Sequence, residues 1–258
     1  DENGVISLDD LKQALRPDTI LVSVMTGNNE VGSHMPITEI GAIVAKSNAW
    51  FHTDAVQAVG NVKIDVKDMN IDLLSLAGHK VYGPKGIGAL YIRKGIRIDN
   101  LIHGGGQERA RRAGTENIPA IVGLGKAMEI AGENLDEHIA KISKLRDKLI
   151  KGLLEVPFTR LNGPKDGNKR LPGNVNVCFE FIEGEGILLS LDFEGICGSS
   201  GSACTSGSLD PSHVLLAIGL PHEIAHGSLR LSLGEGTTEE DVDYVLEKVT
   251  PIIARLRS

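Results

Sequence analysis

The sequence predicts an α/β protein that continues into a smaller α+β domain. Between residues 19 and 93, short apolar runs alternate with amphipathic helical segments, which is typical of a sheet covered on both faces. From residue 138 onward, a strand of alternating polarity, short elements and a long final helix replace that regular alternation. We therefore expect domains at residues 1–137 and 138–258.

The elements of the first domain follow from capping residues and apolar spacing. Ser7 is a helix-capping residue type that precedes an amphipathic segment, and Ile40, Ile43 and Val44 recur at helical spacing. Apolar runs of strand length lie between these helical segments and predict strands. The expected order is a helix from Ser7, a buried strand at 19–25, a helix at 36–47 and strands at 49–53, 71–76 and 88–93.

The second domain begins after a long helical pattern. Residues 118–154 have this pattern, with a charged interruption at 133–137 that marks the boundary. Beyond it we expect a half-exposed strand at 174–181, a helix at 186–192 and a strand at 228–233. Residues 237–240 predict a capping box for a final helix. Its apolar face would hold Val242, Val245, Leu246, Val249, Ile252, Ile253 and Leu256.

Composition and charge narrow the functional classes. The chain has 258 residues, of which 41% are hydrophobic and 24% charged, an ordinary composition for a folded domain. Its net charge of −7 argues against direct binding to nucleic acid or a membrane surface, and leaves small molecules and proteins as partners. Three cysteines, with neither a secretory signal nor a membrane-spanning run, indicate a reducing compartment. We expect a cytoplasmic protein without disulfides.

Polar residues stand where two predicted strands end, the usual place for a ligand crevice in such sheets. Asp54 follows one strand, and His79 and Lys80 follow another. A lysine there can form a Schiff base, and a neighbouring carboxylate is what the ring nitrogen of pyridoxal phosphate needs. A solvated lysine and a helix-capping Asp54 are the plainer alternatives. The remaining histidines lack ligand spacing, so we expect no metal site.

One cysteine differs from the others in its setting. Cys204 lies in a run of small, flexible residues from Ser199 to Ser206, whereas Cys178 lies in an alternating run at 175–179 and Cys197 in an apolar stretch. A thiol in such a run can be incidental, but a reactive thiol must be accessible in this way. Cys204 is therefore a candidate nucleophile.

Four motifs join these residues in a fixed order. They are His52-Thr53-Asp54-Ala55-Val56-Gln57, Gly78-His79-Lys80 with Tyr82-Gly83-Pro84-Lys85-Gly86, His103-Gly104-Gly105-Gly106-Gln107-Glu108-Arg109, and Ser199 to Ser206. On these motifs the whole chain resembles the cysteine desulfurases of the class V aminotransferase group, in the iron–sulfur-cluster and nitrogenase-maturation branch. The resemblance implies the large domain of a fold type I pyridoxal-phosphate-dependent transferase, truncated at its N-terminus, and a small C-terminal domain with the Cys204 loop.

The resemblance also implies how the cofactor is bound. Lys80 would bind pyridoxal phosphate covalently, Asp54 would pair with the ring nitrogen, and Gln57 would bond the phenolic oxygen. His79 would hold the phosphate and help to move protons. Thr115 would reach the phosphate bound by the second subunit of a homodimer.

Substrate and reaction follow from the same resemblance. Asn29 would lie near the cofactor and the carboxylate of L-cysteine, and Arg230 would grip that carboxylate. Cys204 would take the substrate's sulfur as a persulfide, and L-alanine would leave. The sulfur would then pass to an iron–sulfur scaffold or another acceptor protein.

The chain departs from the family pattern in three respects. Ala77 stands where a serine would bond the cofactor phosphate, and Ala110 replaces a glycine. The family also carries a substantial segment ahead of Asp1, which supplies a phosphate-cradling turn and a histidine that stacks on the cofactor. A noncatalytic desulfurase-like scaffold that needs a separate N-terminal piece, and another class V enzyme such as a selenocysteine lyase, therefore remain as alternatives.

Overall fold

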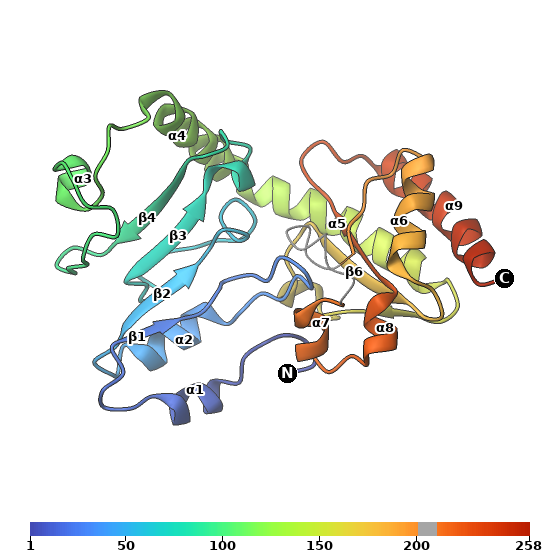
Figure 1. Cartoon of the computed structure of the whole chain (residues 1–258), viewed down its shortest axis with the longest axis horizontal. Coiled ribbons are helices and arrows are strands. Elements are labelled where there is room, and N and C mark those ends of the chain that lie inside the picture. The colour runs from blue at the N-terminus through green and yellow to red at the C-terminus, as the bar shows by residue number, and fades with distance from the viewer. Residues whose placement is uncertain (201–210) are drawn as a thin grey trace. The chain divides into compact units, whose positions relative to one another are not determined.

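The computed structural model describes residues 1–200 and 211–258, which form two compact units. Unit 1 comprises residues 1–10, 27–35 and 136–258, and unit 2 comprises residues 11–26 and 36–135. Each unit has a sheet of its own, and Figure 1 labels the helices and strands. No helix in the described ranges is long and apolar enough to span a membrane.

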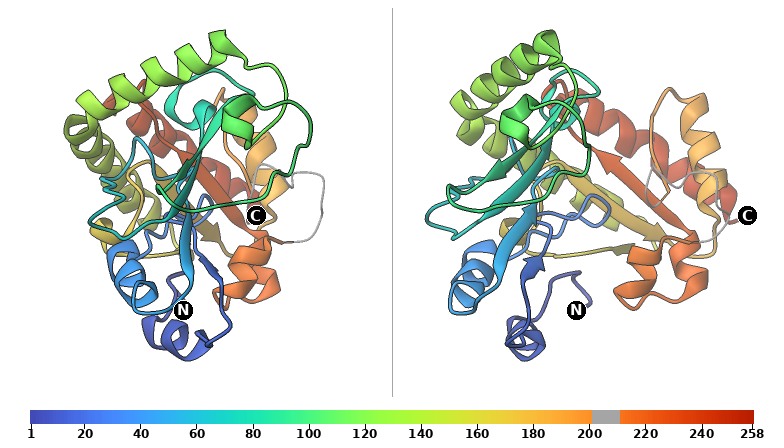
Figure 2. Two further views of the ribbon diagram at one scale, coloured as in Figure 1. Left: turned by 90° about the vertical axis from the view of Figure 1, so that its left-hand side faces the viewer. Right: turned by 60° about the vertical axis from the view of Figure 1, so that its left-hand side comes forward.

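The sheet of unit 2 is built from neighbouring strands in chain order. It contains β1 (Leu21–Ser23), β2 (Trp50–Asp54), β3 (Leu73–Ala77) and β4 (Gly88–Ile92). The first three strands are parallel, and β4 is antiparallel to β3. They lie side by side in both views of Figure 2. Because β2 and β3 are parallel, their carboxyl ends meet at one edge of the sheet.

Strand β1 differs from the buried strand expected at residues 19–25. It is three residues long, and the side chains of Ile20 and Leu21 are 78% and 48% exposed. Among the described residues, β1 pairs with β2 only and forms the edge of the sheet. An apolar run indicates a strand but does not show whether a neighbour covers it.

Two of the helices in unit 2 bury apolar residues on one face. The helices of this unit are α2 (Ile37–Val44), the four-residue α3 (Gln107–Ala110), α4 (Ile118–Glu133) and the 3₁₀ turn η1 (Gly78–Val81), while α1 (Leu8–Ala14) has residues in both units. Ile40 and Val44 are buried on α2. A Cβ at Gly123 of α4 would lie 2.6 Å from the Cγ of Pro84, so this glycine lets the chain after η1 pack closely against α4.

Unit 1 has an antiparallel sheet in the order β5-β6-β7. Its strands are β5 (Thr159–Leu161), β6 (Asn174–Phe179) and β7 (Ser228–Ser232). Its longer helices are α5 (Leu135–Leu154), α6 (Gly184–Phe193) and α9 (Glu239–Leu256), and its short ones are η2 (Gly167–Lys169), α7 (His213–Ala217) and α8 (His222–His226). Side chains of α5, α6, α9, β6 and β7 form one apolar core, which includes Ile142, Leu149, Leu153, Val175, Val177, Phe179, Ile187, Leu229, Val249 and Ile253.

Two predictions for unit 1 had different outcomes. The final helix begins with a capping box, one residue later than the 237–240 expected: the Oγ1 of Thr238 accepts from the Asp241 amide at 3.2 Å, and the Asp241 carboxylate accepts from the Thr238 amide at 2.9 Å. The half-exposed strand expected at 174–181 is wrong, because every residue of β6 is buried. Strand β6 lies between β5 and β7, and residues 29 and 30 bond to its polar side chains.

The compact units differ from the expected domains in two segments. The chain divides between Leu135 and Asp136, but residues 1–10 and 27–35 group with the C-terminal part. Ser33 forms a β-bridge with Arg170, whose Nη1 donates to the Val31 carbonyl at 2.9 Å. Arg170 and Val31 are 139 positions apart in the sequence. Local periodicity cannot detect such a bond, so it assigns both segments to the first domain.

Candidate active site

The carboxyl edge of β2 and β3 holds the candidate cofactor residues of unit 2. Asp54 is the last residue of β2 and stands opposite Ser75 of β3 in the parallel register. Strand β3 ends at Ala77, and η1 follows directly with His79 and Lys80. The side chains of Asp54, His79 and Lys80 are all exposed. A carboxylate at the end of β2 and an amine just after β3 thus lie at the same edge of two adjacent parallel strands.

The turn after β2 is organised by Asp54 itself. Its Oδ1 accepts from the amide of Val56 at 2.9 Å, and Ala55, whose amide donates to the Ser75 carbonyl at 2.9 Å, is fully buried. Gln57 lies half-buried in the same turn. Asp54 therefore closes a turn and does not cap a helix, since no helix lies between β2 and β3, and this bond uses one of its two carboxylate oxygens.

The turn that carries Lys80 depends on the glycine before it. A Cβ on Gly78 would lie 2.8 Å from the Cγ2 of Ile87 and 3.1 Å from its carbonyl oxygen, so a larger residue would push the turn away from the strand that follows. The Gly78 carbonyl accepts from the Gly83 amide at 2.9 Å and closes the turn. His79 and Lys80 therefore project from a backbone that is fixed on both sides.

His52 is a residue that the sequence analysis missed as part of this edge. Its Nδ1 lies 2.7 Å from the Oγ of Ser23 and its Nε2 lies 2.9 Å from the Oγ of Ser75, so one ring links β1, β2 and β3. Burial lowers the pKa of His52, and the charge of Asp54 opposes that shift. A histidine in an apolar strand was the available signal, but its partners are not visible in the sequence.

Unit 1 holds the candidate substrate residues. Arg230 of β7 donates from Nη1 to the carbonyl oxygen of Asn29 at 3.2 Å. The backbones of Ser199 and Arg230 exchange hydrogen bonds of 3.0 and 2.6 Å. The structure thus brings together Asn29, Arg230 and the start of the Ser199–Ser206 motif. Cys204 lies outside the described residues.

Two further features stand apart from these groups. Thr115 is exposed in the segment before α4.

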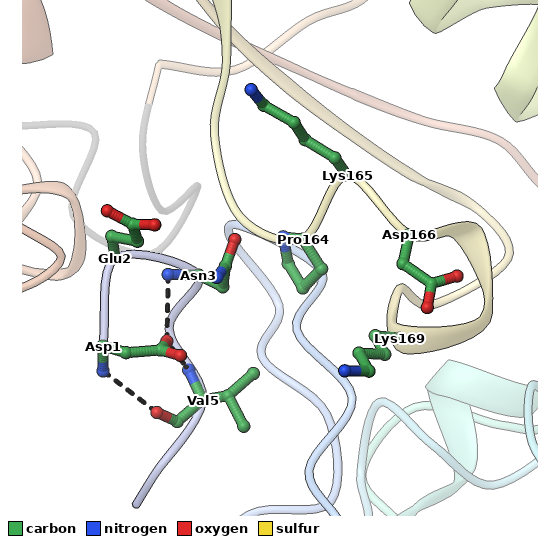
Figure 3. A pocket seen from close by; sticks show the side chains of 8 residues that line it. All are labelled: Asp1, Glu2, Asn3, Val5, Pro164, Lys165, Asp166 and Lys169. Carbon is green, nitrogen blue, oxygen red and sulfur yellow. Dashed lines mark hydrogen bonds between the residues drawn. The ribbon is translucent and has the colours of Figure 1, made fainter.

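A cavity of about 320 Å³ in unit 1 is lined by residues of 1–5 and 164–169 (Figure 3). The carboxylate of Asp1 in this cavity accepts from the amides of Asn3 and Val5, both at 2.9 Å. None of the candidate catalytic residues lines this cavity.

Comparison with known proteins identifies the family. The family model described as "Aminotransferase class-V" matches residues 1–245. The chain belongs to the aminotransferase class V family. The solved structure named "NIFS-LIKE PROTEIN" has the same fold as this chain: the TM-score is 0.90 at 41% identity, over 99% of this chain and 67% of that one. This confirms the predicted family and the predicted fold class of pyridoxal-phosphate-dependent transferases.

Curated class V relatives extend beyond the length of this chain. "Cysteine desulfurase IscS" of Clostridium botulinum is 63% identical over 258 residues, which are 100% of this chain and 65% of that protein. A protein of the same name from Methanosarcina thermophila is 60% identical over 258 residues, 100% of this chain and 63% of its own length. A solved structure named "SspA in complex with cysteine" has a TM-score of 0.73 and 39% identity, over 90% of this chain and 64% of that one. The chain therefore spans less than two thirds of these relatives.

The residues at the β2–β3 edge fit the cofactor of the class V family, pyridoxal phosphate. Lys80 supplies a primary amine for its aldehyde, and Asp54 has a carboxylate oxygen beyond the one that caps the turn. Gln57 and His79 add hydrogen-bonding groups from the turns that follow the same two strands. The cofactor prediction is confirmed for the family, and the donor set of this chain is suited to it.

Proposed function

We propose that this chain takes part in a cysteine desulfurase, which converts L-cysteine to L-alanine and passes the sulfur to Cys204. The observation that supports this most directly is the placement of Lys80 and Asp54 after adjacent parallel strands, at one edge of the sheet. When bound there, pyridoxal phosphate supplies an electron sink for the charge left on the substrate when its α-proton is removed. Side chains of this chain bind and orient the cofactor and substrate and move the protons.

Each side chain has a distinct task in this proposal. Asp54 keeps the proton on the ring nitrogen, and Gln57 donates to the phenolic oxygen. His79 holds the phosphate and, with Lys80, moves protons at the substrate. Arg230 holds the substrate carboxylate through charge-assisted hydrogen bonds, since a guanidinium matches a carboxylate in shape and charge.

Sulfur transfer falls to Cys204. Its thiolate attacks the sulfur of L-cysteine, and the carbon–sulfur bond breaks as the new sulfur–sulfur bond forms. The electron pair of the broken bond stays with the carbon fragment, which takes up protons and leaves as L-alanine. Cys204 keeps a persulfide, which an iron–sulfur scaffold or another acceptor protein then receives.

The assembly belongs to the same proposal. We infer a cytoplasmic homodimer in which Thr115 reaches the cofactor phosphate of the second subunit. The exposed position of Thr115 ahead of α4 is compatible with such a contact. Cross-linking of purified protein, with a Thr115→Ala variant assayed for cofactor affinity, tests this part separately.

The absorption spectrum of the protein with added pyridoxal phosphate tests the function first. We expect a visible band from lysine-bound cofactor that is absent in Lys80→Ala, followed by L-alanine and sulfide when L-cysteine and a thiol reductant are added. Cys204→Ser keeps the band and loses the persulfide. A wild-type protein with neither band nor product would favour the noncatalytic scaffold.

A further inference from the structure

The carbonyl oxygen of Asn29 connects the candidate carboxylate site to β6. Besides the bond from Arg230 Nη1 at 3.2 Å, this oxygen accepts from the Nδ2 of Asn174 at 3.3 Å. The same Nδ2 donates to the Glu30 carbonyl at 3.0 Å. Asn174 therefore holds two successive carbonyl groups of the turn that contacts Arg230.

The amide of Asn174 is itself held in one orientation. Its side chain belongs to a residue that is only 6% exposed, and its Oδ1 accepts from the Nη1 of Arg170 at 3.1 Å. A flipped amide would point its NH₂ group at that cation, so the Nδ2 must face the turn. A Cβ at Gly32 would lie 2.5 Å from the Oδ1, so the turn packs directly on this side chain.

The guanidinium of Arg230 has few other restraints from the part of the chain that the structure describes. Among the described residues its side chain makes the Nη1 bond to Asn29, while its buried Nε has no acceptor there. Its orientation therefore depends on where the Asn29 carbonyl lies. That carbonyl accepts from the side-chain amide of Asn174 on β6, the strand that pairs with the β7 strand of Arg230.

We propose that Asn174 is a positioning residue, which sets the direction of the Arg230 guanidinium toward a substrate carboxylate by fixing the Asn29 carbonyl. The inference rests on the proposed function for the nature of the substrate, an α-amino acid. It does not require Asn174 to touch substrate or cofactor. A shift of the turn would cost carboxylate affinity before it affected the chemistry at the substrate's sulfur.

The decisive variant is Asn174→Asp in the cofactor-loaded protein, with Asn162→Ala as the matched control. The aspartate keeps the size of the side chain but replaces the donor that faces both carbonyls. Asn162 is also buried, at 1% exposure, and its Nδ2 bonds Asn176 and Cys178. Asn176 in turn donates to the Glu30 carbonyl, so Asn162 is linked to the turn only through Asn176 and not through the Asn29 carbonyl. The readouts are calorimetric affinity for L-alanine, KM and kcat for L-cysteine, the cofactor spectrum and the melting temperature.

We expect Asn174→Asp to weaken L-alanine binding and raise KM about tenfold, which corresponds to about 1.4 kcal/mol. Its kcat stays within about twofold and its spectrum is unchanged. Asn162→Ala lowers the melting temperature and leaves both affinities within about twofold. If Asn174→Asp does not fold, Asn174→Ser is expected to show the same split between KM and kcat.

Three results would overturn the inference: wild-type affinities in the folded Asn174 variant, equal losses in Asn174 and Asn162 variants, or a wild-type protein that binds no L-alanine. Failure of the proposed function is distinguishable from these. A wild-type protein that binds L-alanine but does not desulfurate L-cysteine refutes the desulfurase reaction. The L-alanine affinities of the variants still decide the role of Asn174 in that case.

Discussion

Replacing Arg170 by lysine tests how a buried guanidinium holds residues 27–35 to unit 1. Arg170 is 4% exposed, and burial, together with the nearby Arg146 charge, lowers its pKa to about 10. It therefore remains a cation at neutral pH. Its donors reach four acceptors: the carbonyls of Pro164 and Val31, both at 2.9 Å, the Oδ1 of Asn174 at 3.1 Å, and the carbonyl of Asn162.

The size of the effect follows from donor geometry. A guanidinium donates from three nitrogens spread over a plane, whereas a lysine ammonium donates from one point and cannot reach acceptors on all sides. We expect at least two buried acceptors to lose their donor in Arg170→Lys. Each such loss costs about 1–3 kcal/mol, so unfolding should become easier by about 2–6 kcal/mol.

Urea unfolding followed by circular dichroism measures this change at neutral pH. The control is Arg160→Lys on β5, where the arginine is exposed and a change within about 0.5 kcal/mol is expected. If Arg170→Lys lowered the unfolding free energy by less than about 1 kcal/mol, the four acceptors would not depend on the guanidinium and the reasoning would be refuted.

Three further predictions use other parts of the chain. His52 has a lowered pKa, so the unfolded state takes up more protons near pH 6.5 and stability should fall as the pH drops below that value; the melting temperature of His52→Gln should vary less with pH, and an unchanged profile would contradict this. Burial raises the pKa of Cys178 to about 11, so iodoacetamide followed by mass spectrometry should label exposed Cys197 in the native protein and Cys178 only after unfolding; native labelling of Cys178 would be the contrary result. Ala77→Ser should lower the dissociation constant of pyridoxal phosphate about 10- to 100-fold by adding a hydroxyl donor, and equal affinity in both proteins would rule this out.

Local patterns predicted the features that local forces decide. The capping box of α9 requires two residues three positions apart, and the break between α4 and α5 lies at the charged interruption. The placement of Asp54 and Lys80 followed from strand ends in a parallel sheet. In each case neighbouring residues contain the needed information.

Long-range bonds decided the features that the sequence analysis missed. Alternation of Asn174 and Asn176 with apolar residues indicated a half-exposed β6, yet both amides are buried because they donate to carbonyls of residues 29 and 30. Nothing near Asn174 in the sequence identifies those acceptors. The two serine partners of His52 were invisible for the same reason.

The sequence separation within unit 1 has a consequence for synthesis of the protein. Asn29 and Arg230, which share a hydrogen bond, are 201 residues apart. At about 5–20 residues per second, a ribosome needs roughly 10–40 s to travel that distance. Throughout this interval the turn at residues 28–32 has left the ribosome without Arg230, and for much of it also without Asn174. The hydrogen bond between Asn29 and Arg230 therefore forms only after Arg230 has been synthesised, and a chaperone that shields this turn would act on the nascent chain before that bond exists.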